Sequence, residues 1–275
     1  MTNKKTKNDI VVSIIMFMLS LIMIFPFFWL FLSAFKTPAD VYTYPPKWFP
    51  SSYKMDNFIQ VFRSIPFGTF YLNTIFTSII QTVLQIGLSI TCAYSLSILE
   101  FPGKKVIYML IQSVMFVPMV VILIPLYMIV SKFHWVNTYM GIIMPQILGV
   151  FTTILLVSFF NTIPKDLIEA PKIDGCNYHQ ILWCMVVPNS TTAISSATLF
   201  AFLSHWKSYI WPLLVTNSTR LRTLPVGLKY LIKEASTEYQ VMMAAALMSI
   251  FPVLLMYILC EKSFVRSLTM TGLKG

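Results

Sequence analysis

The chain has 275 residues, of which 57% are hydrophobic and only 11% are charged, and its formal net charge is +10. Soluble domains carry about 25% charged residues, so this chain has too few charges to cover a surface that faces water. Its mean hydropathy of +0.74 indicates that lipid is the solvent for much of the surface. The basic residues are scattered between apolar runs, which argues against a nucleic-acid binder and fits contact with anionic lipid.

Six apolar segments are each long enough to cross ~30 Å of hydrocarbon, which takes about 20 helical residues. They cover residues 10–35, 70–99, 106–130, 141–160, 191–215 and 241–259. The first follows a basic tail, as in a signal peptide, but it is too long and shows no small-residue cleavage site. We therefore expect an uncleaved anchor and an all-α integral membrane protein with six transmembrane helices.

An even number of spans places both ends of the chain on one side of the membrane. The lysines and arginines are divided almost equally between the two sides. The basic N-terminal tail and the short turn with Lys104 and Lys105 favour cytoplasmic termini, because the rule weights short loops and the first span. Residues 36–68 then form an outer loop rich in Pro, Tyr and Trp, which either rests on lipid headgroups or meets a solute-binding partner.

The predicted spans are interrupted and, in one case, polar. Prolines occur inside them at Pro26, Pro118, Pro125, Pro145, Pro212 and Pro252. In lipid such breaks belong where a helix packs on protein or lines a cavity. The fifth segment, 191–215, is the richest in hydroxyls, which either hydrogen-bond neighbouring helices or line a pathway; their density favours a pathway for part of the segment. The candidate pathway residues are Ser196, Ser204, Lys207, Ser208 and Trp211.

No catalytic or cofactor-binding pattern stands out. The chain lacks the Gly-rich motif that binds ATP phosphates. Cys176, His179 and Cys184 lie close together in sequence, but their spacing matches no common zinc pattern and a fourth ligand is missing. We therefore interpret the cysteines as ordinary thiols and expect no metal, no cofactor and no enzymatic activity.

The polar loop over residues 161–188 carries the most specific pattern. It resembles the signature loop of importer permeases in the ATP-binding-cassette superfamily, which reads Glu-Ala-Ala, three residues, Gly, nine residues and Ile-x-Leu-Pro. The matching positions are Glu169, Ala170, Gly175 and Pro188, and Asp174 before the glycine is also common in the family. Pro171 replaces the second Ala, Met185 replaces Ile and Val187 replaces Leu.

The residues of this loop predict a short helix at the cytoplasmic face. Asp166 and Glu169 suit a first helical turn, where carboxylates complement the dipole, and Gly175 permits a tight stop. A proline costs little in a first turn, so we expect the helix to begin at or just before Pro171. A rigid helix tied to two spans can transmit a partner's motion to a pore.

Further segments extend the resemblance to roughly residues 68–275. Residues 137–145 are similar to the family's entry to its fourth span, residues 222–228 to an outer loop of carbohydrate importers, and residues 264–275 to the C-terminal tail of the maltose-type branch, which reaches between the ATPase subunits. The resemblance implies a type-1 ABC importer transmembrane fold in a bacterial inner membrane. It divides the chain into 1–67 (tail, first helix and outer loop), a translocation core over 68–261 and a cytoplasmic tail over 262–275.

The family also implies partners: a second, similar permease subunit, two ATPase subunits that bind ATP, and an extracytoplasmic solute-binding protein. The residues that would contact the ATPase subunit are Glu169, Ala170, Pro171, Asp174, Gly175 and Pro188. The cargo would be a carbohydrate or a derivative of one.

One departure bears on cargo. The branch often has Trp-Asn followed by an acid at the end of span five, where this chain has Trp206-Lys207-Ser208. Lys207 either reaches the headgroups beside Trp206 and Trp211 or marks a pathway for an anionic solute. The alternatives to an importer subunit are a self-sufficient secondary transporter, which would need acids inside its spans and an internal repeat, and a membrane enzyme, which would need a catalytic cluster; we find neither pattern.

Overall fold

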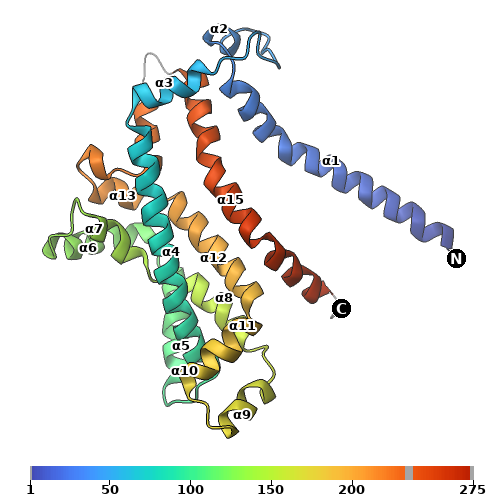
Figure 1. The fold of residues 1–275 in the computed structure, drawn as a ribbon, viewed down its shortest axis with the longest axis vertical. Helices are drawn as coiled ribbons and strands as arrows, with labels where there is room; N and C mark the ends of the chain where they lie inside the picture. The colour runs from blue at the N-terminus through green and yellow to red at the C-terminus, as the bar shows by residue number, and fades with distance from the viewer. Residues whose placement is uncertain (1, 233–237, 273–275) are drawn as a thin grey trace. The chain divides into compact units, whose positions relative to one another are not determined.

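The structure is a computed structural model that describes residues 2–232 and 238–272, and all regular structure in these ranges is helical. The chain forms two compact units, residues 1–67 with 227–251 and residues 68–226 with 252–275. The helices α4 and α15 each run through a boundary between these ranges (Figure 1). Residues 233–237, and residues 273–275 of the predicted tail, lie outside the described residues.

The first unit is built on α1 (Thr2–Ala34), α2 (Pro38–Val41), α3 (Asp56–Ser64), η5 (Lys229–Leu231) and the first half of α15 (Tyr239–Gly272). The apolar window of α1 within Asp9–Ala34 has no buried share. The segment after α1 folds back on its end, because the buried Asn57 side chain donates hydrogen bonds to the carbonyls of Ala34 and Lys36, both at 2.9 Å. Gln60 also donates to Glu238 at 2.5 Å, which ties α3 to the residue before α15.

The second unit is organised along α4 (Phe67–Ser97). The other helices of this unit, in chain order, are α5 (Lys104–Ser113), η1 (Val114–Phe116), α6 (Met119–Lys132), α7 (Tyr139–Ile143), η2 (Met144–Gln146), α8 (Val150–Phe160), α9 (Asp166–Ile173), α10 (Tyr178–Ile181), the π-helical η3 (Leu182–Val186), α11 (Val187–Asn189), α12 (Thr191–Trp206), α13 (Ile210–Val215), η4 (Thr219–Leu221) and α14 (Leu224–Leu228), which continues into the first unit. An apolar core of this unit joins α4, α8, α10, η3 and α12 and includes Tyr94, Leu156, Phe160, Val186 and Ala197.

Four of the six predicted apolar segments coincide with helices that are long and apolar enough to cross a membrane: Asp9–Ala34, Phe67–Ser97, Tyr139–Phe160 and Tyr239–Glu261. The third predicted segment is not one straight helix. Lys104–Phe116 and Met119–Lys132 meet at 104°. The break lies at Pro118, which has no N–H, and the preceding Val117 takes an extended conformation with φ −83° and ψ 115°, as steric contact with a proline ring favours.

The fifth predicted segment, 191–215, is not one continuous helix either. Its helix α12 ends at Trp206, and α13 begins only at Ile210. Towards its start, Tyr178–Asn189 and α12 form a second bent pair at 83°. The described residues therefore hold four to six candidate spans, depending on whether each bent pair crosses once.

Candidate functional site

Helix α9, which we predicted to begin at or just before Pro171, begins five residues earlier, at Asp166. Pro171 lies inside the helix and is buried. A proline at this position removes one backbone hydrogen bond, to the carbonyl four residues before it. That carbonyl belongs to Leu167, which is exposed, so water can satisfy it and the helix tolerates the proline. Asp166 and Glu169 both lie in the first turn, where the dipole favours them.

The end of α9 follows the prediction. Gly175 has a φ of +85°, in the left-handed region that glycine adopts without strain. The Cys176 N–H bonds to the Pro171 carbonyl at 2.9 Å, and the Gly175 N–H bonds to the Lys172 carbonyl at 3.3 Å. This pair of bonds is a Schellman motif, which satisfies carbonyls at a helix end. The motif needs only the carbonyl of Pro171, so the N–H that proline lacks does not affect it.

One side of α9 is held and another is free in the described chain. Ile163 and Ile168 pack against the core of the second unit. Leu167 and Ile173 are 43% and 85% exposed, and Glu169 and Ala170 are also exposed. Figure 1 shows α9 at one end of the second unit, beyond the longer helices. The helix therefore presents apolar and acidic side chains on an accessible face.

A cavity of about 330 Å³ lies between α9 and the ends of α4 and α8. Its charged lining residues are Glu100, Lys165, Glu169 and Lys172. Because the charges balance, the cavity has no strong preference for one sign of charge. It separates part of α9 from the helices behind it.

Pro188 lies on α11, beyond the π-helical turn, and not on α9. The π-helical segment η3 comes immediately before it, and the Val187 N–H bonds to the carbonyl of Leu182, five residues back. A proline ring collides with the carbonyl four residues before it in an α-helix, so a wider turn relieves the collision. The segment from α10 to α11 is therefore a helix with one wider, π-helical turn before Pro188.

The predicted pathway residues of span five do not lie on one surface. Ser204 and Lys207 are exposed and Ser208 is half-buried. Ser196 is buried and its hydroxyl donates to the Thr192 carbonyl of its own helix at 3.0 Å. The structure therefore brings Ser204 and Lys207 to one end of α12 and leaves Ser196 among the packed helices.

Trp211 also lies in the interior. It is 2% exposed, packs in an apolar cluster with Val130 and Val215, and its indole N–H donates to the Gly141 carbonyl at 3.0 Å. A Cβ on Gly141 would collide with the carbonyl of Trp135. Only glycine fits this close approach to Trp135. The hydrogen bond from Trp211 to Gly141 fixes α13 against α7.

A polar stripe on α4 is the feature that the sequence analysis missed. Side chains at every fourth position face the same way on an α-helix, and all members of this stripe are buried. The stripe consists of Asn73, Thr77, Gln81, Gln85 and Ser89. The spacing of four is present in the sequence and could have identified the stripe. The many apolar residues between its members indicated only a membrane span, so the stripe was not recognised.

The stripe holds the neighbouring helices to α4. At one end the Asn73 amide donates to the carbonyls of Arg220 and Arg222 at 2.8 and 2.9 Å, and the Tyr139 hydroxyl donates to Asn73 Oδ1 at 2.7 Å. Further along, Gln81 donates to the Ile142 carbonyl at 2.9 Å. These bonds satisfy backbone groups that would otherwise be buried without partners.

Gln85 forms the centre of the stripe. Its amide donates to Thr152 Oγ1 of α8 at 2.7 Å, and its carbonyl oxygen lies 2.8 Å from His205 Nε2 of α12. Since that oxygen is an acceptor, Nε2 is the ring nitrogen that carries the proton. A Cβ on Gly149 would collide with the Gln85 side chain, so the glycine leaves the room that Gln85 occupies.

Two contacts with α4 fix the end of α12 beside Lys207. His205 bonds Gln85, and the Trp206 ring packs edge-on against Tyr71 with centroids 5.8 Å apart. Lys207 follows as the residue that caps the helix end, with its side chain exposed. The position of the Lys207 backbone is therefore set by α4, while its ammonium group remains accessible.

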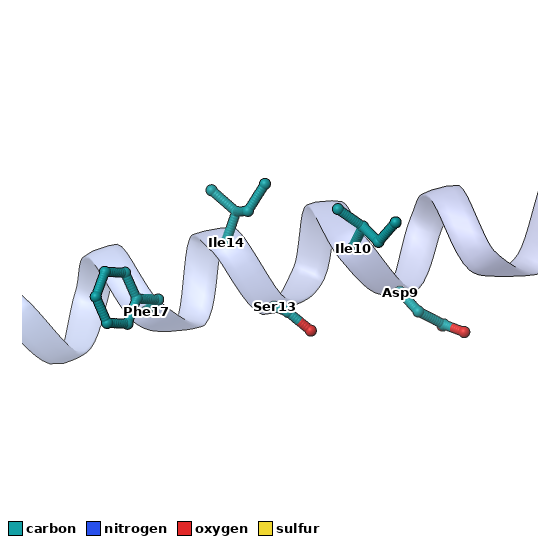
Figure 2. Close-up of a pocket in the computed structure, with 5 residues that line it drawn as sticks. All are labelled: Asp9, Ile10, Ser13, Ile14 and Phe17. Atoms are coloured by element: carbon teal, nitrogen blue, oxygen red, sulfur yellow. The ribbon is translucent and has the colours of Figure 1, made fainter.

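The surface of α1 carries a shallow hollow that holds no comparable site. Figure 2 shows its lining residues, Asp9, Ile10, Ser13, Ile14 and Phe17, all on consecutive turns of this one helix. Side chains from a single helix cannot converge on a ligand from several directions, as binding sites require. We therefore place the candidate functional site in α9 and in the α4–α12 network.

Comparisons with known proteins find a matching family model and related proteins. A family model described as "Binding-protein-dependent transport system inner membrane component" matches residues 85–261. A sulfoquinovosyl glycerol transport system permease protein of Agrobacterium fabrum is 33% identical over 254 residues, which are 92% of this chain and 89% of the relative. An arabinooligosaccharides transport system permease protein of Bacillus subtilis is 28% identical over 270 residues, 97% of this chain and 96% of the relative.

Two further similarities extend over nearly the whole chain. An sn-glycerol-3-phosphate transport system permease protein of Yersinia pestis is 27% identical over 268 residues, 94% of this chain and 95% of the relative. Among solved structures, a bacterial ABC transporter involved in the import of the acidic polysaccharide alginate matches with a TM-score of 0.82 and 24% identity, covering 96% of this chain and 99% of that one. The last match shows a shared fold.

Proposed function

The chain belongs to the family of binding-protein-dependent transport system inner membrane components, and from this premise we propose that it forms half of the membrane pathway of an ATP-driven importer. The relatives named above are permease proteins of transport systems and not enzymes. In this proposal the chain performs no chemistry. It alternates between inward-facing and outward-facing arrangements, driven by ATP binding and hydrolysis in other subunits.

The proposed assembly lies in a bacterial inner membrane. The chain crosses six times with both ends in the cytoplasm, each bent helix pair counting as one span. A second, similar permease subunit supplies the other half of the pathway, two ATPase subunits bind α9 and its counterpart, and a solute-binding protein delivers cargo from outside. The segments 1–67, 68–261 and 262–275 serve as anchor with outer loop, translocation core and cytoplasmic tail.

The accessible face of α9 is the observation that supports this proposal most strongly. Ile173 is 85% exposed at the end of a helix that is rigidly capped and anchored by Ile168. An apolar residue this exposed on an ordered helix marks a protein interaction site when it lies beside other accessible apolar groups, here Leu167 and Ala170. The proposed contact set is Glu169, Ala170, Pro171, Asp174, Gly175 and Pro188, with Pro171 acting from the buried side.

Two substitutions that change the charge of the exposed face of α9 test the proposal. Glu169→Lys and Ile173→Asp should each reduce co-purification of the ATPase subunit and solute uptake, because one inverts a charge and the other adds a charge to the docking face. Both residues are exposed, so membrane insertion and expression should not change. The matched control is Asp56→Lys, which inverts an exposed acid in the first turn of α3. Full uptake and normal co-purification in both α9 variants would refute the docking role.

For the cargo we propose a carbohydrate or carbohydrate derivative, and an anionic one if Lys207 lies in the pathway. The exposed ammonium at the end of α12 can attract an anion, and one relative is by its name a permease protein of an sn-glycerol-3-phosphate transport system. Ser204 and Ser208 flank Lys207 on the same stretch and would supply hydroxyl contacts, whereas Ser196 and Trp211 would shape the pathway by packing.

Uptake measurements with Lys207→Ala separate the two roles of this lysine. A lysine in the pathway predicts a loss of uptake that is larger for anionic than for neutral solutes, with Lys207→Arg retaining most of it. A lysine that only reaches the lipid headgroups predicts unchanged uptake of every transported solute by Lys207→Ala.

A further inference from the structure

A buried cluster of charges lies where α1 ends, in the first unit. Lys36 and Asp40 are each 2% exposed. The Lys36 ammonium donates to the Lys47 carbonyl at 2.7 Å and lies 3.8 Å from the centre of the Trp29 ring. Asp40 forms an ion pair with the Lys47 ammonium at 3.0 Å. None of these residues is part of the proposed transport machinery.

The single carboxylate of the cluster is fully occupied. Asp40 accepts hydrogen bonds from the Ser51 hydroxyl at 2.6 Å, the Ser51 N–H at 3.1 Å and the Thr37 hydroxyl at 2.8 Å, besides Lys47. These bonds, that from the Ser51 hydroxyl first, hold the pKa of Asp40 well below its usual range. Asp40 is therefore a permanent anion at neutral pH, and its charge is balanced by Lys47.

Lys36 is the second cation of the cluster, beside an Asp40 that already pairs with Lys47. Within the described ranges it forms no ion pair, and burial lowers its pKa, an effect that the charge of Asp40 offsets in part. An ammonium has three N–H donors. In Lys36 one of them bonds the Lys47 carbonyl, and the ammonium lies over the face of the Trp29 ring. A buried cation without a counter-ion is costly, so a site that keeps one is suited to an external anion.

A cavity of about 220 Å³ adjoins this lysine and is lined by Trp29, Ser33, Lys36, Asp40, Lys47 and Tyr239 among others. The Ser33 side chain is nearly buried and its hydroxyl makes no hydrogen bond with the described residues. The cavity thus offers an unused hydroxyl donor beside an unused ammonium donor. Hydroxyl and ammonium donors together form a typical phosphate site.

The place of the cavity in the chain indicates the source of the anion. It opens where the apolar run Asp9–Ala34 stops, which is the depth of lipid headgroups for a helix that spans the hydrocarbon. Trp29 and Trp48 pack edge-on at 5.8 Å beside it, and Trp48 is 58% exposed, as in the aromatic belts at membrane boundaries. We propose that this cavity binds the phosphodiester headgroup of an anionic lipid through Lys36 and Ser33.

Native mass spectrometry of the full-length protein, purified with the subunits that accompany it, tests the site. Probes are phosphatidylglycerol, phosphatidylcholine and inorganic phosphate, added separately in mixed micelles or buffer. We expect phosphatidylglycerol to remain bound and to raise the melting temperature. Phosphatidylcholine should do so less, because its choline brings a cation towards Lys36 and Lys47. Protection by inorganic phosphate alone, at the same phosphorus concentration, would overturn the lipid assignment.

Three variants decide which residues carry the binding. Lys36→Gln should weaken phosphatidylglycerol binding at least about tenfold, and Ser33→Ala a few-fold, as loss of a charged and a neutral hydrogen bond predicts. Lys54→Gln is the matched control, because Lys54 is exposed on the same segment and does not line the cavity. If Lys36→Gln does not fold, Ser33→Ala alone still decides. Equal binding of phosphatidylglycerol by Ser33→Ala and the native chain, or equal loss in Lys54→Gln, would refute the proposal.

Discussion

At the scale of single residues, buried side-chain amides determine the packing of the second unit. Gln85 is the clearest case, because both ends of its amide are used, one by Thr152 and one by His205. In a bilayer, lipid tails compete with apolar side chains for helix surfaces, so packing and polar contacts between helices carry more of the specificity. Gln85 therefore sets how α8 and α12 lie against α4.

The first prediction concerns this amide. Gln85→Leu should destabilise the purified protein by about 1–2 kcal/mol, because it leaves His205 and Thr152 without partners. Thermal unfolding measures the effect, and Thr91→Val on an exposed position of the same helix should change little. In the double variant Gln85→Leu/His205→Leu the two losses should be less than additive, since the variants remove one shared bond. Strict additivity would contradict the contact.

The second prediction is a pH dependence that comes from Asp40. Its pKa in the folded protein is lowered, chiefly by the Ser51 hydrogen bond. A carboxylate with a depressed pKa adds stability above its unfolded pKa of about 4, and this stability is lost as the pH falls through the folded pKa. The protection factors of the amides in residues 37–51, which compare the observed with the intrinsic exchange rate at each pH, should therefore fall progressively below about pH 4.

Asp40→Asn supplies the control for this dependence. It should cost roughly 1–3 kcal/mol at neutral pH through weakened hydrogen bonds and should remove the acid-induced change in this segment. Asp56→Asn, at an exposed position of the next helix, should leave both the stability and the pH profile as they are. A pH profile of Asp40→Asn equal to the native one would assign the dependence to another group.

At the scale of elements, helix ends and breaks distinguish this chain from a bundle of straight spans. Glycine serves α9 by its backbone conformation alone, because a Cβ at Gly175 would meet nothing within 4 Å. Gly87 in the interior of α4 likewise has open space around a Cβ, but its backbone is helical. The two positions therefore isolate the conformational cost, because a Cβ meets no obstacle at either of them.

A matched pair of substitutions follows as the third prediction. Gly175→Ala should destabilise the end of α9 by about 1 kcal/mol, because alanine resists the left-handed conformation, and Gly175→Asn should cost less. Gly87→Ala should be neutral or stabilising by up to about 1 kcal/mol, since alanine favours a helix interior. Hydrogen exchange over residues 166–176, together with the melting temperature, reports both. Equal effects of the two alanines would show that conformation is not the determining factor.

The sequence predicted some of these elements and not others, for physical reasons. Uniformly apolar runs such as 10–35 and 241–259 became helices, since a run of that length has one stable arrangement in lipid. Pro118 was recognised as an interruption, but the sequence did not show that the helix turns sharply there, because a proline in an apolar run can either kink a span or end it, and only the packing of neighbours decides. The break after Trp206, which has no proline, was not predicted. Pro171 was misplaced because its cost depends on whether the carbonyl of Leu167 can reach water.

At the scale of the whole molecule, membrane topology is the property that most needs a direct measurement. The described helices include four continuous candidates and two bent pairs. In the proposed orientation, α9 and α10 lie inside the cell and the segment 35–55 lies outside. The free cysteines offer probes for this arrangement, because Cys184 is exposed on η3 whereas Cys260 is buried.

The fourth prediction uses these thiols. A membrane-impermeant maleimide should label Cys184 in inside-out vesicles and not in intact cells, and Cys184→Ser should abolish that labelling. A cysteine introduced by Ser52→Cys on the exposed outer segment, in a background without the native thiols, should give the reverse pattern. Labelling of Cys184 from outside intact cells would invert the topology and remove the case for ATPase docking at α9.

The lack of burial along the apolar window of α1 has a consequence for the fate of a subunit that is made in excess. Because no share of its apolar window is buried by the rest of the described chain, α1 adds almost nothing to the packing energy of a single copy. In the proposed assembly this surface is left to lipid or to a second subunit. If a second subunit covers it, we expect a copy made in excess of its partner to hold this span less firmly and to be degraded sooner than an assembled copy.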